Sequence, residues 1–251
     1  MSEAASPLPS ALDSSRRPFL LRKLHSLSGV VPVGAFLLFH LWTNATALQG
    51  QERYDDAVAG ISHMPFVGVV EVLAIFLPLG FHALYGVKIA LEGRPNLKAY
   101  PLARNWMYVL QRVTGIAAFA FICFHLWEYW FQKQIGRLAP SDFYPTLCAN
   151  LSSTLGGVPA VALVYLLGIA ACVFHFTNGL WGFCFSWGIT VSRRAQRLSA
   201  TVFGLAGVVL FLLGANTAIY FATGSRLAFS GHLFGSVGAS AARTCAEINV
   251  R

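Results

Sequence analysis

Long apolar stretches alternate with short polar segments over most of the chain. Five of these stretches exceed the ~20 residues that a helix needs to cross the hydrocarbon core of a membrane. They lie at roughly 27–48, 66–91, 105–131, 158–189 and 199–223. Backbone N–H and C=O groups find no water in hydrocarbon, so they must be paired within the segment, which favours helices. The pattern therefore predicts an all-α membrane protein with five transmembrane helices.

The segments outside these stretches divide the chain. Residues 1–18, rich in Ser, Pro and Ala, are predicted to form a mobile tail, 19–223 the membrane domain and 224–251 a second tail. The start also resembles a signal peptide, with a cleavage site at Ala45-Thr46-Ala47. However, the apolar run is longer than in a usual signal sequence and contains His40. We therefore expect this segment to be retained as the first helix.

Composition and charge agree with a membrane setting. Hydrophobic residues make up 56% of the chain and charged residues 11%, and the mean hydropathy is +0.60. A net charge of +8 is also typical of nucleic-acid-binding proteins, but most basic residues here fall on one side of the five helices: Arg16, Arg17, Arg22, Lys23, Arg94, Lys98, Arg104, Arg193, Arg194 and Arg197. The positive-inside rule then predicts a cytoplasmic N-terminus, an outer C-terminal tail and no nucleic-acid partner.

Four histidines lie well inside four of the apolar stretches, each directly after a phenylalanine. His40 and His125 share the sequence Phe-His-Leu-Trp, whereas His82 and His175 share Phe-His-x-x-x-Gly. An imidazole in hydrocarbon is costly unless something binds it. Haem iron takes neutral imidazole as an axial ligand and brings an apolar macrocycle. Four histidines match two haems, and iron held by two histidines has no open position, so the pattern predicts electron transfer rather than oxygen binding.

The predicted topology sorts the four histidines into two layers. His40 and His125 lie ~25 Å from the cytoplasmic ends of their helices, whereas His82 and His175 lie ~15–20 Å from theirs, at 1.5 Å per residue. The sequence therefore predicts an outer haem between His40 and His125 and an inner haem between His82 and His175. Helices one to four would form the bundle around both haems. The fifth helix has no histidine and is predicted to pack outside this bundle.

Further residues are candidates for contacts around the haems. Gly86 and Gly179 lie one turn after their histidines on the same face, where a macrocycle or a neighbouring helix could approach closely. Arg112, near the inner end of the third helix, is expected to pair with a haem propionate. Glu128 lies close enough to a helix end to reach water, so it is given no specific role.

A quinone is the expected small-molecule partner, and two regions are candidates for contacting it. Glu71 lies one to two turns into the second helix from the outer side, where a carboxylate can exchange protons with a quinone. Its alternative role is a hydrogen bond to a neighbouring helix. At the inner side, His25, with Arg22 and Ser26 beside it, is expected to contact a haem propionate or a quinone.

Several other sites receive a simpler interpretation. The four membrane histidines could instead be hydrogen-bonded core residues, and a zinc or copper site is disfavoured by the lack of nearby carboxylates or thiols. The chain has no CxxC pair and no nucleotide-binding glycine motif, so flavin and iron–sulfur clusters are not expected in it. Cys148 and Cys245 fall on the same outer side, and their pairing in a disulfide is left open.

Several longer motifs resemble one family, the cytochrome b membrane-anchor subunits of two-haem succinate:quinone oxidoreductases (succinate dehydrogenase or fumarate reductase). The similarity covers about residues 19–223 and rests on segments 22–27, 81–87, 104–115, 124–128 and 174–181. The resemblance implies two haems b, with His82 and His175 nearer the cytoplasm. It also implies a flavoprotein and an iron–sulfur subunit on the cytoplasmic face, menaquinone as the usual acceptor, and a bacterial cytoplasmic membrane with its lipid as the setting.

Two other classes of protein remain as alternatives. One is the cytochrome b subunit of a hydrogenase or formate dehydrogenase, which would be distinguished by the soluble subunits that copurify. The other is a non-redox multi-pass membrane protein with structural histidines, which would show no haem absorbance.

Overall fold

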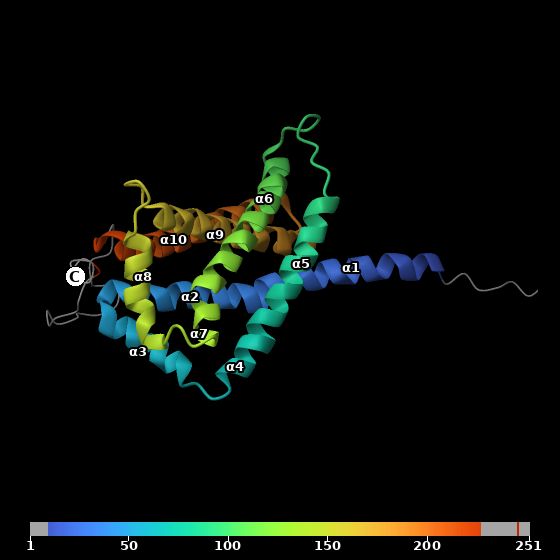
Figure 1. Cartoon of the computed structure of the whole chain (residues 1–251). Coiled ribbons are helices and arrows are strands. Elements are labelled where there is room, and N and C mark those ends of the chain that lie inside the picture. Colours follow the sequence, from blue (N-terminus) through green and yellow to red (C-terminus); the bar gives the residue numbers. More distant parts are fainter. Residues whose placement is uncertain (1–9, 227–244, 246–251) are drawn as a thin grey trace, which may run out of the picture.

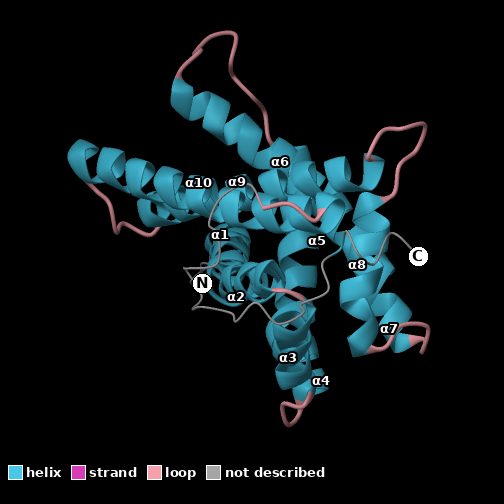
Figure 2. Ribbon diagram, turned by 90° about the vertical axis from the view of Figure 1, so that its left-hand side faces the viewer, coloured by secondary structure: helices cyan, strands magenta, loops and turns pink. Residues whose placement is uncertain are grey.

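A computed structural model describes residues 10–226 and Cys245 (Figure 1). These residues form helices and loops (Figure 2), with a single isolated β-bridge between Leu155 and Val158. Five helical segments are long and apolar enough to cross a membrane, which confirms the predicted number: Arg17–Gln49, Val67–Glu92, Ala103–Gln134, Ala160–Ser186 and Arg193–Thr223. The observed ends differ from the predicted ones by a few residues, except at the starts of the first and fifth helices.

The first span is built from four consecutive helical pieces. These are α1 (Ser10–Ser28), the π-helical η1 (Gly29–Val33), α2 (Gly34–Ala45) and the 3-10 turn η2 (Thr46–Gln49). The helix thus begins inside the range predicted to be a tail, because a helix that is anchored in the membrane adds further turns at little cost.

The remaining spans are also partly irregular. The second contains α4 (Val67–Val70), η3 (Glu71–Phe76) and α5 (Leu77–Glu92), and the third contains α6 (Ala103–His125), η4 (Leu126–Phe131) and α7 (Gln132–Gln134). The fourth and fifth are the continuous helices α9 (Ala160–Ser186) and α10 (Arg193–Thr223). The widened π-helical turns η1, η3 and η4 carry or adjoin candidate site residues, as such turns often do. Pro78 is the second residue of α5, just after η3.

Packing between the spans gives a four-membered ring with one helix outside it. The first span packs against α5, α5 against α6, α6 against α9, and α9 against the first span. As a result, α5 and α9 are diagonal partners, and so are the first span and α6. Helix α10 packs against α9 and α2, outside the ring, as predicted. In Figure 1, α5 and α6 cross the other long helices steeply.

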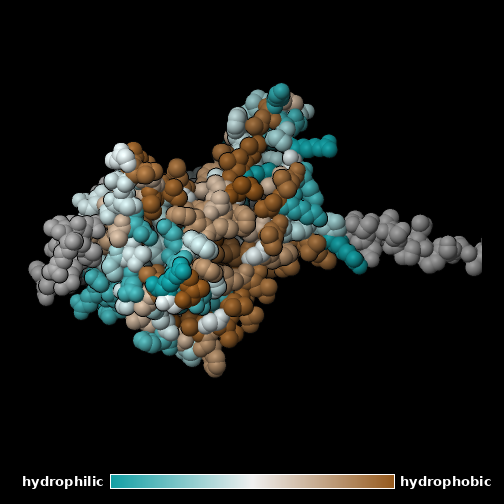
Figure 3. Space-filling view, in the orientation of Figure 1, coloured by the Kyte–Doolittle hydropathy of each residue, from teal (hydrophilic) through white to brown (hydrophobic). Residues whose placement is uncertain are grey.

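The outer surface of the spans is apolar. Leu84 and Leu91 of α5, for example, are 70% and 81% exposed, which is expected of side chains that face lipid rather than water. Figure 3 shows hydrophobic residues across the middle of one face and hydrophilic residues gathered towards its ends.

One end of the bundle, here called the cap end, carries a compact polar and aromatic cap. Helix α8 (Phe143–Ser152) packs there against α10, and helix α3 (Gln51–Ser62) and the short turn η5 (Pro140–Asp142) pack against α8 and against each other. Tyr54, Tyr144 and Phe221 are buried in contact with one another. Burial raises the pKa of the Tyr54 and Tyr144 hydroxyls above its usual range.

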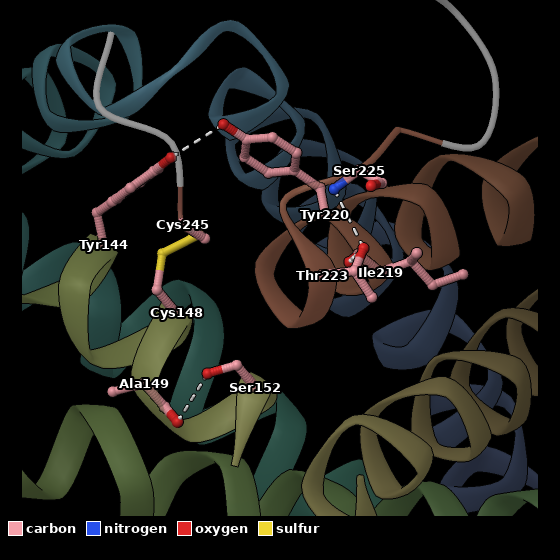
Figure 4. The surroundings of a disulfide bond; sticks show 9 residues. All are labelled: Tyr144, Cys148, Ala149, Ser152, Ile219, Tyr220, Thr223, Ser225 and Cys245. Carbon is pink, nitrogen blue, oxygen red and sulfur yellow. Dashed lines mark hydrogen bonds between the residues drawn. A yellow bond between two sulfur atoms is a disulfide. The ribbon is translucent and has the colours of Figure 1, made fainter. Parts of the chain in front are cut away.

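A disulfide bond ties the cap to the C-terminal part of the chain. The sequence left this pairing open, and the structure joins Cys148 of α8 to Cys245 (Figure 4). Both sulfur-bearing residues are buried, and the hydroxyls of Tyr144 and Tyr220 lie 3.1 Å apart beside them. The opposite end, here called the basic end, brings together the residues Arg22, Lys23, Arg94, Lys98, Arg104, Arg193, Arg194 and Arg197.

Candidate functional site: two histidine pairs

The four membrane histidines meet as two pairs across the diagonals of the ring. His82 of α5 and His175 of α9 form the basic-end pair, with ring centroids 6.0 Å apart and ring planes inclined by 81°. His40 of α2 and His125 of α6 form the cap-end pair, with centroids 5.6 Å apart and planes inclined by 74°. The combinations are those that the sequence grouped by depth and local motif.

In the basic-end pair, both histidines are held by backbone carbonyl groups. Nδ1 of His82 lies 2.9 Å from the carbonyl oxygen of His25, and Nδ1 of His175 lies 3.0 Å from that of Gln111. A carbonyl oxygen can only accept a hydrogen bond, so each imidazole carries its proton on Nδ1. The lone pair of each Nε2 is therefore free to bind a metal ion.

The two halves of the basic-end pair repeat one local design. Gly29 lies four residues after His25 and faces the His82 ring, and Gly115 lies four residues after Gln111 and faces His175. A Cβ on Gly115 would lie 2.8 Å from the His175 ring, and one on Gly29 would clash with the His82 ring. The histidine rings therefore fit only because these glycines have no side chain.

Gly86 and Gly179 occupy the matching places on the histidine helices. A Cβ on Gly86 would lie 3.0 Å from Nε2 of His25, and one on Gly179 would lie 3.3 Å from the side-chain nitrogen of Gln111. A neighbouring helix therefore approaches each glycine closely, which was one of the two expectations for them. His25 and Gln111 are equivalent positions in this repeat.

In the cap-end pair, side chains rather than backbone groups hold His125. The hydroxyl of Tyr165 on α9 donates to the Glu128 carboxyl group at 2.9 Å, and Nδ1 of His125 lies 3.1 Å from the same hydroxyl oxygen. Because the hydroxyl proton is directed to Glu128, the oxygen accepts the Nδ1 proton of His125. Nε2 of His125 is thus also free.

His40 is held differently from the other three. The side-chain amide of Asn44, one turn further on, donates to the backbone carbonyl of His40 at 2.9 Å. The same amide nitrogen lies 3.5 Å and 3.4 Å from the two ring nitrogens. These longer contacts do not fix which nitrogen carries the proton.

The residues grouped around His25 lie at the basic end. The His25 ring stacks on His82, with centroids 4.2 Å apart and planes inclined by 6°. Arg22 pairs with Glu92 of α5 at 3.1 Å, and Ser26 is half-buried on α1. His25 thus contacts a member of the basic-end pair directly, through both its ring and its backbone carbonyl.

Arg112 and Glu71 lie at opposite ends of the bundle. The Arg112 guanidinium group stacks over the Tyr108 ring at 3.4 Å and packs against Gly93. Its Nε is buried and has no hydrogen-bond partner in the described part of the chain. Glu71 lies 3.9 Å from Lys133, a separation at which the charges attract without forming a hydrogen bond.

The geometry of the pairs fits a metal held between two imidazoles. With metal–nitrogen bonds of about 2 Å on each side, the centroids of two such rings would lie about 6 Å apart. Both observed separations are close to this value. Between residues 10 and 226, no three or more His, Cys, Asp or Glu side chains gather as a metal ion bound by protein alone would need. Haem iron needs only two protein ligands, and Arg112 offers an unpaired donor for a propionate.

Comparison with known proteins shows the family of the chain. A family model described as the succinate dehydrogenase/fumarate reductase transmembrane subunit matches residues 92–214. Over 208 residues the chain is 41% identical to the succinate dehydrogenase cytochrome b558 subunit of Bacillus subtilis. The aligned region covers 83% of this chain and 99% of that protein. The chain belongs to this family. The resemblance found in its motifs is thereby confirmed.

A more distant similarity is limited to part of the chain. Over 112 residues the chain is 26% identical to the proton extrusion protein PxcA of Trichormus variabilis, and to the PxcA protein of Nostoc sp. to the same degree. These matches cover 45% of this chain but only 23% of each PxcA protein. They carry no further argument.

Sequence reasoning missed several residues that build the pairs. Glu128 received no role and Tyr165 was not considered, yet together they hold His125. Gly29 and Gly115 each follow a serine or a threonine in the sequence, but their contact with the histidine rings was not predicted. The equal spacing of four residues from His25 to Gly29 and from Gln111 to Gly115 was the signal available.

Proposed function

We propose that the chain is the membrane anchor and two-haem cytochrome b subunit of a succinate:quinone oxidoreductase. It would pass electrons between cytoplasmic flavoprotein and iron–sulfur subunits and a membrane quinone, with menaquinone as the first candidate. The observation that carries this proposal is the meeting of four histidines as two pairs at metal-bridging distance. Family membership supports it independently.

The two histidines of each pair would hold the iron of one haem b. Each haem supplies a one-electron carrier within the membrane. His82 and His175 present Nε2 because their Nδ1 protons are donated to carbonyl groups, and His125 presents Nε2 because of Tyr165. Arg112 would bind a propionate through its unpaired Nε. His25, with Arg22 and Ser26, would line the approach to the basic-end haem, towards a propionate or a quinone.

The proposed orientation follows from charge. The basic end would face the cytoplasm of a bacterium and the cap end the outside, so that residues 19–223 form the membrane domain and 224–251 an outer tail. Six basic residues at the basic end are exposed, as a docking surface for an iron–sulfur subunit requires: Arg94, Lys98, Arg104, Arg193, Arg194 and Arg197. Electrons would then enter beside the basic-end pair.

The quinone site would lie near the cap-end pair, beside Glu71. Quinone reduction takes up two protons, so a titratable group must lie near the headgroup. Glu71 and Lys133 face each other across the second and third spans without a hydrogen bond. Trp130 lies nearby on η4, packed against Phe76, and its buried Nε1 has no partner among the described residues. These groups offer one proton acceptor and two hydrogen-bond donors for a quinone.

The test is to purify the chain with the soluble subunits that accompany it and to measure its spectrum, redox titration and activity together. We expect two low-spin haem b transitions and succinate-dependent reduction of a menaquinone analogue. A complex without haem absorbance would mean that the histidines are structural. A haem-containing complex that oxidised hydrogen or formate instead of succinate would identify a different partner enzyme.

A further inference from the structure

A series of side-chain contacts connects His125 to Glu128. It consists of the 3.1 Å contact from His125 to Tyr165 and the 2.9 Å hydrogen bond from Tyr165 to Glu128. The other two histidines with a fixed Nδ1 proton donate to neutral backbone carbonyls. Of these three, His125 alone is linked to an acidic group.

The surroundings of Tyr165 hold its hydroxyl in one position. The Tyr165 ring is buried and meets Phe121 edge-on, with centroids 5.3 Å apart. Phe121 in turn packs closely over Gly168, one turn along α9, where any side chain would clash with its ring. The tyrosine therefore has little freedom to turn its hydroxyl away from His125 and Glu128.

We propose that Tyr165 and Glu128 are positioning residues that set the electron affinity of the cap-end haem through His125. This inference rests on the proposed function, because it requires His125 to bind the haem iron. A hydrogen bond accepted from the Nδ1 proton makes an imidazole a stronger electron donor to its metal. Since Tyr165 donates to a carboxyl group, its oxygen becomes a better acceptor, and the effect on His125 is strengthened. The bond thus favours the oxidised haem.

The test compares the midpoint potentials of both haems in Tyr165→Phe and Glu128→Gln complexes. Phenylalanine keeps the ring but removes the hydroxyl. The one-electron equilibrium at the cap-end haem should therefore move about tenfold towards the reduced form, which raises its midpoint potential by about 59 mV. Glutamine at position 128 can still accept the hydrogen bond from Tyr165, but it is not an acid. The midpoint potential of the cap-end haem should therefore shift in the same direction by a smaller amount. The basic-end potential should not change.

The matched control is Tyr220→Phe. The Tyr220 hydroxyl is also buried and lies 3.1 Å from another side chain, Tyr144, and among the described residues no histidine contacts it. This variant should leave both potentials unchanged. The ferric low-spin electron paramagnetic resonance signal of the cap-end haem should move in Tyr165→Phe and stay in place in Tyr220→Phe.

Each result decides the question. Unchanged potentials in Tyr165→Phe with both haems present would overturn the proposal, as would equal shifts at both haems. If Tyr165→Phe loses the cap-end haem altogether, the Glu128→Gln complex provides the test instead. An unchanged cap-end potential in the Glu128→Gln complex would show that Tyr165 only supports the fold. Absence of haem from the unmodified complex would instead refute the proposed function.

Discussion

The two histidine pairs are built in different ways, although they occupy equivalent diagonals of one helical ring. The basic-end pair relies on backbone carbonyls and glycines, in two nearly identical halves. The cap-end pair relies on side chains, Tyr165 and Glu128 on one side and Asn44 on the other, and the two sides differ. Backbone groups persist whatever the side chain, whereas side-chain partners can be changed singly. The cap-end pair is therefore the more adjustable of the two.

The surroundings of the two pairs also differ in how densely they are packed. Most of the buried side chains of the described structure gather at the cap end, where α3, α8 and α10 meet under the disulfide. The basic end presents exposed charge. The cap-end pair is covered by packed side chains, whereas the basic-end pair lies beside a charged surface. This arrangement suits electron entry at the basic end.

Replacing single histidines is the change expected to have the largest effect. Alanine at His82 or His175 should remove the spectrum and redox transition of the basic-end haem, and alanine at His40 or His125 those of the cap-end haem. Each proposed haem would need both of its histidines, because iron held by two histidines is bound by no other protein group. Redox titration of the four complexes measures this. Survival of both haems in any one of them would show that the pairing is wrong.

Charge reversal at the basic end should release most of the soluble dehydrogenase from the membrane. The variant combines Arg94→Glu, Lys98→Glu and Arg194→Glu, which replace exposed attraction with repulsion. Succinate oxidation with a soluble dye should move from the membrane fraction to the supernatant. The matched control reverses Arg53 and Arg137, which are exposed at the cap end. Equal retention in both variants at moderate salt would argue against docking at the basic end.

Glu71→Gln tests whether quinone chemistry occurs beside the cap-end pair. Glutamine keeps the size of the side chain but cannot exchange a proton, so quinone reduction should slow about 10²-fold. Both haems and dye-coupled succinate oxidation should be retained, which separates proton transfer from packing. Normal quinone turnover would direct attention to His25, Arg22 and Ser26 at the basic end.

Gly29→Ala should weaken only the basic-end haem. A Cβ at this position would clash with the His82 ring, and crowding of this kind typically costs about 1–3 kcal/mol. We expect a lower content of that haem, with a milder loss in Gly115→Ala. Gly80→Ala on α5 is the control, because no atom lies within 4 Å of the Cβ it would add. If all three variants behave alike, the close approach of histidine and glycine is unimportant.

The sequence was sufficient to predict the five spans and to group the histidines, because both depend on patterns along single helices. Apolar length indicated the spans, and charge asymmetry gave the relative depth of the histidines. The contacts of His25, Glu128 and Tyr165 could not be predicted from the sequence. They depend on how far each helix is rotated about its axis, and Tyr165 lies 37 residues from Glu128 on another helix. No spacing rule connects residues so separated.

Breaking the disulfide should leave both haems bound at ordinary temperature and lower only the thermal stability of the cap-end pair. Cys148 and Cys245 are separated by 97 residues, and a crosslink closing so long a loop typically contributes about 2–4 kcal/mol, mainly by restricting the unfolded chain. Cys148→Ser should therefore lower the temperature at which the cap-end haem is lost, with the basic-end haem lost later. Cys123→Ser is the control, because Cys123 is exposed and unpaired. Simultaneous loss of both haems, at one temperature in both variants, would show that the cap does not stabilise its neighbouring pair separately.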